Sequence, residues 1–160
     1  MNPYADDLGD RDPLTVLREA PHRIRAVVAK LGDGAFLRTY EAGKWTVQQI
    51  IAHLLHAEIA FNFRIRQALA IDNYVAQSFD QDDWMNSEPA LNGTVALEAY
   101  DHLRQFNLAL YQSLSPAGLA RPFLHPDLGE MTVGLIIELM AGHELRHLSQ
   151  LETILANHTH

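Results

Sequence analysis

The segment from residue 133 to residue 155 carries apolar side chains at steps of three and four, the spacing of one face of an α-helix. Two histidines and a glutamate interrupt this apolar face: His143, Glu144 and His147. Histidines four residues apart lie on the same side of a helix, about 6 Å apart along its axis, where both rings can bind one metal ion. Because polar groups are costly to bury without a partner, this helix is expected to carry either a metal site or hydrogen-bonded core histidines.

Composition limits both the kind of site and the kind of partner. A chain of 160 residues suits a single domain with one core, so we expect one helical domain over residues 1–160. The chain has no cysteine, which leaves His, Asp, Glu and water as metal ligands. A net charge of −8 without a basic stripe argues against nucleic acid as a partner. No apolar run is long enough to span a membrane, and the N-terminus lacks the layout of a signal peptide, so we expect a cytoplasmic protein without a membrane partner.

The N-terminal region is expected to form a loose segment followed by two helices. Residues 1–12 are polar and predicted to lie loosely. Asp12 is a suitable N-cap and Pro13 a suitable first residue for a short helix. Pro21 cannot continue that helix unkinked, so we expect it to open a second helix that ends at the glycine-rich residues 32–34.

Two long helices follow in the middle of the chain. Thr46 and Gln49 have the spacing of a capping box, and apolar residues recur at helical steps from there to about residue 69. Thr94 is expected to cap the next helix, which Pro116 stops. Residues 72–92 and 115–130 are predicted to be loops. Without an alternating strand pattern, these helices and the last one predict an all-α four-helix bundle.

The helix that follows Thr46 contains two histidines with different positions around its axis. His53 lies about 100° from the centre of the apolar stripe, beside small alanines, whereas His56 lies nearly opposite that centre. His53 is therefore the better ligand candidate, and His56 is expected at the surface. Helical bundles place metal sites between facing helices, so His53 is expected to meet the two histidines of the last helix.

Charged residues also lie near these histidines. Glu58 falls inside the apolar stripe of its helix and needs a partner, which we expect to be Arg64 or a histidine. A structural role and a catalytic role for Glu58 are both open. The residues that we predict to act as base, to orient a ligand or to supply positive charge are Glu58, Glu144 and Arg64.

The segment 44–54, KWTVQQIIAHL, with Glu58 and Arg64 after it, resembles the DinB-like family, also called the DinB/YfiT superfamily. The loop at 79–84, FDQDDW, is similar to a pattern in one branch of that family. The segment 142–150, GHELRHLSQ, resembles its closing helix. The order and spacing of the three motifs together are more specific than any one of them.

This resemblance implies a four-helix bundle with an up-down-down-up connection, usually a homodimer. It implies a divalent metal held by three histidines, which fall on His53, His143 and His147, the same three residues that the helix positions favour. Zinc or nickel is expected, with iron or manganese as alternatives. Ile59 and Phe63, apolar residues on the outer side of their helix, add weak support for a homodimer.

The resemblance also implies an enzyme that acts on a small molecule, by transfer of a low-molecular-weight thiol or by hydrolysis. Arg146 stands where many members of the family carry another histidine. The segment from His143 to His147 also matches the H-E-x-x-H motif of zinc proteases, but Gln150 and Thr153 occupy positions where metzincins need Gly and His. The 13 residues that follow His147 leave no room for the downstream glutamate of the other large protease group. A non-catalytic metal-binding or structural bundle is the alternative to an enzyme.

Overall fold

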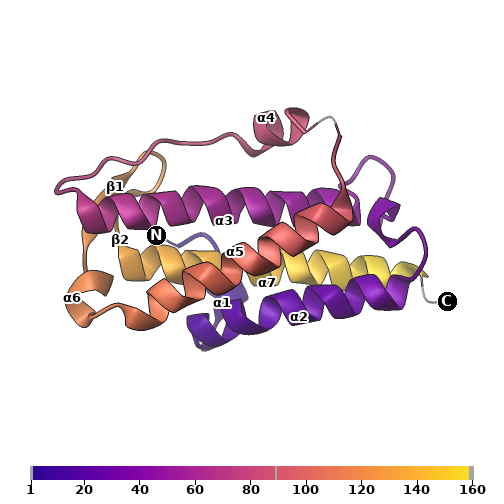
Figure 1. The fold of residues 1–160 in the computed structure, drawn as a ribbon, viewed down its shortest axis with the longest axis horizontal. Helices are drawn as coiled ribbons and strands as arrows, with labels where there is room; N and C mark the ends of the chain where they lie inside the picture. The colour runs from indigo at the N-terminus through magenta and orange to yellow at the C-terminus, as the bar shows by residue number, and fades with distance from the viewer. Residues whose placement is uncertain (1, 89, 159–160) are drawn as a thin grey trace.

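Four long helices lie side by side in the computed structural model, which describes residues 2–88 and 90–158 (Figure 1). They are α2 (Pro13–Leu31), α3 (Val47–Ala70), α5 (Gly93–Ser113) and α7 (Val133–His158). Helices α2 and α7 run in one direction, and α3 and α5 run in the opposite one (Figure 1). The predicted four-helix bundle with its up-down-down-up connection is confirmed.

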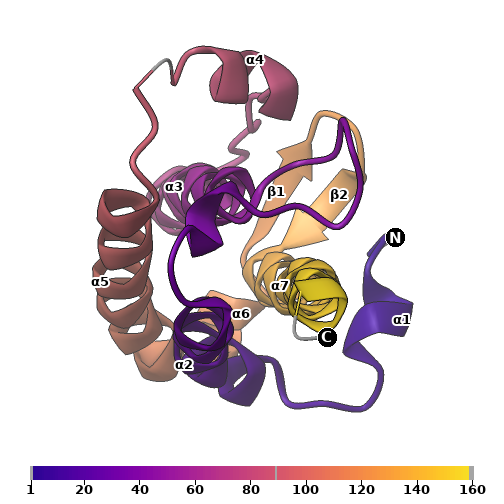
Figure 2. The same cartoon turned by 90° about the vertical axis from the view of Figure 1, so that its right-hand side faces the viewer.

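The four helices close a ring around the core. Helix α2 contacts α7 and α5, and α3 contacts the same two helices from the other side (Figure 2). Apolar side chains form two buried clusters, one toward each end of the bundle. None of the helices in the described residues is long and apolar enough to cross a membrane. Ile59 and Phe63 are 45% and 57% exposed on α3, and the homodimer, like the cytoplasmic location, stays a prediction.

Helix α2 is continuous, so the prediction that Pro21 begins a separate helix is wrong. The side chain of Asp12 caps α2, as predicted, by accepting a hydrogen bond of 2.7 Å from the backbone N–H of Thr15. Proline removes one backbone hydrogen bond from a helix interior. Burial of the apolar face of α2, with Leu17 and Ile24 fully enclosed, holds the helix together across that gap.

The predicted caps of the two middle helices have different outcomes. The Thr46–Gln49 capping box at the start of α3 is confirmed, with both reciprocal hydrogen bonds present. Helix α5 begins one residue before Thr94, so the cap predicted there is wrong. The side chain of Asn92 accepts hydrogen bonds from the backbone N–H groups of Thr94 and Val95 instead. Asparagine is at least as good an N-cap as threonine, and Asn92 caps α5 in place of Thr94.

The long connection over residues 72–92 was predicted as a loop and contains a short helix, α4 (Gln81–Asn86). Asp80 caps it by accepting hydrogen bonds from the backbone N–H groups of residues 82 and 83. The connection runs back along the length of α3, so that α5 starts beside the start of α3 (Figure 1). This return explains why α3 and α5 are parallel.

The second predicted loop, over residues 115–130, is also partly regular. It contains α6 (Pro116–Leu119) and an antiparallel hairpin of β1 (Pro122–His125) with β2 (Gly129–Thr132). Four-residue strands are too short to give a clear alternating pattern in a sequence. The remaining short helices are η1 (Ala35–Leu37), which precedes α3, and α1 (Ala5–Leu8) near the N-terminus.

The N-terminal segment packs against α7, so the prediction of a loose segment over residues 1–12 is wrong for the described residues. Tyr4 lies against Gly142, where a Cβ atom would approach the backbone oxygen of Tyr4 to 2.3 Å. Only glycine permits this approach. Arg146 holds the same segment by an ion pair with Asp7 at 2.9 Å, and its guanidinium lies over the Tyr4 ring.

A buried charge cluster joins all four helices between the two apolar clusters. Arg104 of α5 is 2% exposed and donates to Glu58 of α3 at 3.0 Å and to Glu144 of α7 at 2.8 Å. Its third contact is the backbone oxygen of Leu17 in α2, at 3.1 Å. One guanidinium therefore hydrogen-bonds to three helices from a fourth.

The other oxygens of the two carboxylates are also hydrogen-bonded. Asn107 donates to Glu58 at 2.9 Å, and the Tyr100 hydroxyl donates to Glu144 at 2.7 Å. The prediction that Arg64 or a histidine pairs with Glu58 is wrong, because Arg104 occupies that place. Buried carboxylates need such partners, since an unpaired buried charge is strongly destabilising.

Replacement of Arg104 by methionine is expected to lower the unfolding free energy by about 3–5 kcal/mol, because it leaves two buried carboxylates without their cation. Urea denaturation at pH 7 measures this loss. Arg23→Ala is the control, since its ion pair with Glu152 is about half exposed and is expected to contribute less than about 1 kcal/mol. Equal losses in the two variants would contradict the prediction.

Candidate metal centre

Three buried histidine rings meet between α3 and α7. His53 projects from α3, and His143 and His147 project from successive turns of α7. The Nε2 atom of His143 lies 2.9 Å from that of His53 and 3.1 Å from that of His147. The structure thus brings together the three residues that the sequence predicts as ligands, with one ligand atom of each within 4.8 Å of the others.

The donor set fits a divalent ion. Bonds of about 2.0–2.1 Å to tetrahedrally arranged imidazole nitrogens correspond to nitrogen separations of about 3.3 Å, close to those seen. Three nitrogens that face one another need a proton or a cation between them, because their lone pairs otherwise repel. Three ligands also leave one tetrahedral position for water or substrate, the arrangement of catalytic zinc sites.

Burial keeps these rings neutral. It lowers the pKa of His53 to about 3, and the nearby His147 ring adds to the shift. Burial also lowers the pKa of His143 well below its ordinary value, with further contributions from the other two rings. The pKa of His147 is lowered by burial as well. Only the neutral form of histidine offers a lone pair to a metal, so the environment favours binding at neutral pH.

Neighbouring side chains set the orientation of the rings. The Nδ1 atom of His147 lies 2.8 Å from the side-chain oxygen of Gln150, which directs Nε2 toward the other histidines. The Tyr4 ring contacts His143 edge-on, with centroids 5.2 Å apart, and the Trp45 ring lies 4.9 Å from that of His53. The sequence could have indicated the contact of Gln150 with His147, since Gln150 lies three residues after this ligand on the same helix. It could not have indicated the contacts of Tyr4 and Trp45, because these residues lie on chain segments far from the ligands in sequence.

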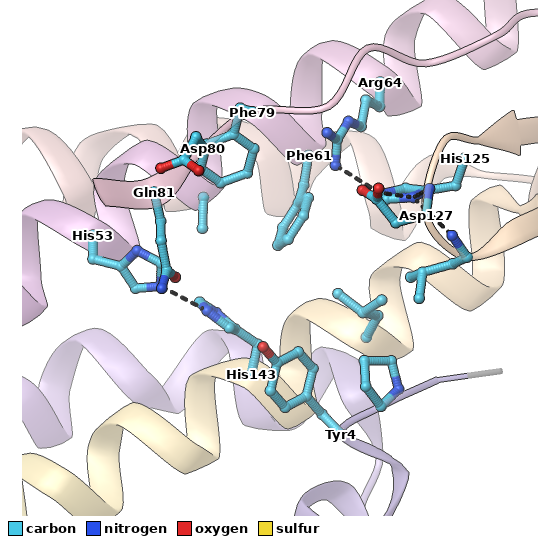
Figure 3. Close-up of a pocket in the computed structure, with 14 residues that line it drawn as sticks. Tyr4, His53, Phe61, Arg64, Phe79, Asp80, Gln81, His125, Asp127 and His143 are labelled. Carbon is cyan, nitrogen blue, oxygen red and sulfur yellow. Dashed lines mark hydrogen bonds and ion pairs between the residues drawn. The ribbon is translucent and has the colours of Figure 1, made fainter. Parts of the chain in front are cut away.

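A pocket of about 330 Å³ opens beside two of the three histidines. Figure 3 shows His53 and His143 on one side of it and Arg64 with His125 on the other. Most of the remaining wall comes from the N-terminus, from α3, from the start of α4 and from the turn of the β1–β2 hairpin; its main residues are Tyr4, Phe61, Phe79, Asp80, Gln81, Asp127 and Leu128. The size suits a small molecule.

The family model of the DinB superfamily matches residues 17–151. The chain belongs to the DinB superfamily. A protein of Oceanobacillus iheyensis, named as a candidate metal-dependent hydrolase, is 26% identical over 139 residues, which cover 86% of this chain and 81% of that protein. A protein of Bacillus licheniformis with the same kind of name is 27% identical over 139 residues, covering 85% and 79% of the two chains.

A solved structure gives a fold comparison for this DinB superfamily member. YfiT from Bacillus subtilis, described as a probable metal-dependent hydrolase with an unusual four-helix bundle topology, matches with a TM-score of 0.79. The match covers 89% of this chain and 83% of YfiT at 23% sequence identity. At that identity the comparison concerns the fold alone.

The other predicted site residues of this DinB superfamily chain lie in two different places. Arg64 is in the pocket wall, opposite the histidines (Figure 3). Glu58 and Glu144 lie in the buried charge cluster, where Arg104 and its neighbours occupy their oxygens. Their catalytic roles stay a prediction.

His56 is 5% exposed, so the prediction of a surface position is wrong. The Trp84 ring of α4 lies edge-on to it, and Glu88 reaches its Nε2 atom at 3.2 Å. The connection that contains α4 covers α3 around His56, which helix position alone does not reveal. His56 nevertheless makes its contacts with Trp84 and Glu88 and is not one of the three converging histidines.

The metal-free protein is expected to lose stability as the pH falls below about 6.5, the ordinary pKa of histidine. The three ring pKa values are lowered in the folded state, so the unfolded state binds protons first and stability present above pH 6.5 is lost toward acid. Each ring contributes a slope of up to about 1.4 kcal/mol per pH unit. Urea denaturation of metal-free protein at pH 7.5, 6.5 and 5.5 measures how the unfolding free energy depends on pH. The His53→Gln variant should show a shallower pH dependence of this free energy. An unchanged slope in that variant would count against the prediction.

Proposed function

We propose that this DinB superfamily protein is a metal-dependent enzyme that acts on a small molecule in the pocket beside His53, His143 and His147. One observation carries the proposal: three buried imidazole Nε2 atoms converge, and two of these rings form part of the pocket wall. The names of the relatives support metal dependence. The alternative of a non-catalytic bundle is less well supported, because a purely structural metal site is normally closed to ligands.

The residues of the chain have separate tasks in this proposal. A divalent ion bound there, zinc or nickel in our proposal, would supply a Lewis acid that lowers the pKa of a water or thiol at its fourth position. The neutral rings hold the ion, and Gln150 keeps His147 turned toward it. Phe61, Phe79 and Tyr4 supply aromatic parts of the pocket wall.

Hydrolysis is the reaction that the names of the relatives favour. Thiol transfer is the second candidate, and the donor set supports it. Three neutral imidazoles leave the full positive charge of the ion uncompensated, so an anionic fourth ligand such as hydroxide or thiolate is favoured. A carboxylate among the ligands would have reduced that preference.

Glu58 and Glu144 are assigned positioning roles in this proposal. Glu58 follows His53 by five residues on α3, and Glu144 directly follows His143 on α7. Because Arg104 binds both carboxylates, the two helices are held in the register that brings their histidines together. Proton transfer by either glutamate would first require it to leave that cluster.

Alanine substitution of His53, His143 or His147 is expected to lower zinc or nickel affinity at least tenfold, since each change removes one of three ligands. Metal analysis after equilibrium dialysis measures the loss. His56→Ala is the matched control, because it removes a buried histidine from α3 that does not face the site. The wild-type chain and the control should also gain thermal stability from added metal, because an ion that binds only the folded state stabilises it. Unchanged metal content in all three ligand variants would disprove the site.

Cobalt-substituted protein is expected to develop an intense sulfur-to-cobalt charge-transfer band when a small thiol is added. The physical reason is that the open position favours an anion, and thiol binding should release about one proton near neutral pH. His53→Ala should change the cobalt spectrum in the absence of thiol. If several thiols leave the wild-type spectrum unchanged while His53→Ala alters it, the metal site stands and thiol transfer is excluded in favour of hydrolysis.

A further inference from the structure

Arg64 is a buried cation that forms no ion pair with a carboxylate in the part of the chain that the structure describes. Its side chain is 4% exposed, and no carboxylate in residues 2–88 and 90–158 forms an ion pair with it. Arg104, the other buried arginine among the described residues, has two glutamates around it. Burial lowers the pKa of Arg64 despite the smaller opposing effects of Tyr74 and Asp127, and this shift reflects the cost of keeping the charge away from water. An uncompensated buried charge is seldom retained for stability alone.

The guanidinium of Arg64 lies in the pocket wall across from the metal histidines (Figure 3). It donates to the backbone oxygen of Gln77 at 2.6 Å and faces His125 Nε2 at 3.1 Å. The central carbon of this guanidinium, Cζ, lies 5.7 Å and 5.6 Å from the ring centroids of Phe61 and Phe79. A guanidinium has five N–H groups, so these contacts leave donors for a ligand.

His125 faces more donors than it can accept from. Its Nδ1 atom lies 3.2 Å and 3.3 Å from the backbone nitrogens of Asp127 and Leu128, which are donors. Its Nε2 atom faces Arg64, which is also a donor. A neutral imidazole has one acceptor nitrogen and one N–H group. Burial and the adjacent Arg64 lower the pKa of His125, which favours this neutral form. If Nδ1 accepts from the backbone, Nε2–H and Arg64 are two donors that lack a common acceptor.

We propose that Arg64 and His125 together bind the carboxylate of a small organic acid, which is the substrate class of this pocket. One carboxylate oxygen accepts from Arg64 and from Nε2–H of His125, which supplies both the missing charge and the missing acceptor. The apolar body of the acid contacts Phe61, Phe79 and Leu128. The inference deepens the proposed function, on which it rests, because the other end of the acid then faces His53 and His143 (Figure 3).

The charges around the pocket favour one carboxylate over two. Asp127 lies at the rim with its side chain 70% exposed, and its oxygen is 3.9 Å from His125 Nδ1. Asp80, also in the wall, caps α4. Both carboxylates would repel a second negative charge on the ligand, whereas Arg64 compensates the first. The preferred ligand is therefore a monocarboxylate.

Binding of 3-phenylpropionate and of the matched neutral 3-phenylpropionamide to the metal-stripped full chain tests the inference. The acid is expected to bind at least tenfold more tightly than the amide by isothermal titration calorimetry. Arg64→Met should remove this preference. Arg66→Met is the matched control, because Arg66 is on the same helix and lies over Phe106 outside the pocket. Equal affinities of acid and amide for the wild type, or a preference that survives in Arg64→Met, would overturn the proposal.

A second measurement needs no variant. In protein with ¹⁵N-labelled histidine, the acid is expected to shift the imidazole resonances of His125, and the amide is not. Unchanged His125 resonances at saturating acid would overturn the proposal. Because the protein is stripped of metal in both experiments, a carboxylate preference without metal binding would defeat the proposed function alone. Metal binding without that preference would defeat this inference alone.

Discussion

The contact of Arg104 with Glu58 and Glu144 is the constraint on which the rest of the bundle depends. A guanidinium and two carboxylates without water are stable only when every charge has its partners in place. In this chain the partners come from different helices, and the same guanidinium also binds a backbone oxygen of α2. Apolar packing above and below tolerates small shifts of one helix along another, but this polar layer does not. The contact thereby fixes the positions of the helices relative to one another along the bundle axis.

That constraint determines the geometry of the histidine site. A shift of one residue between α3 and α7 moves side chains by about 1.5 Å along the axis, about half of the distances that separate the Nε2 atoms. With Glu58 and Glu144 bound to one arginine, the Nε2 atoms of His53 and His143 are held 2.9 Å apart. The folded bundle therefore preorganises the three histidines, and the free-energy cost of ordering them belongs to folding and not to metal binding.

Periodicity and helix position predicted the parts of the structure that depend on local spacing. The apolar stripes predict the long helices, and the angular positions of His53, His143 and His147 place them on facing surfaces. What could not be predicted depends on contacts between distant segments. The partner of Glu58 was missed because Arg104 lies on a different helix, α5, and its contact with α3 depends on how distant segments pack. His56 was misplaced because a later connection covers it.

The approach of Tyr4 to Gly142 gives the site an element that can move independently of the bundle. Helix α1 has four residues and packs mainly on α7, so its detachment exposes far less apolar surface than unfolding of a long helix. Segments of this kind open locally, at a free-energy cost below that of global unfolding. Because the Tyr4 ring contacts that of His143, local opening of this segment would uncover one side of the proposed centre. Exposure of that side would then depend on the attachment of the N-terminal segment and not on unfolding of the four-helix core.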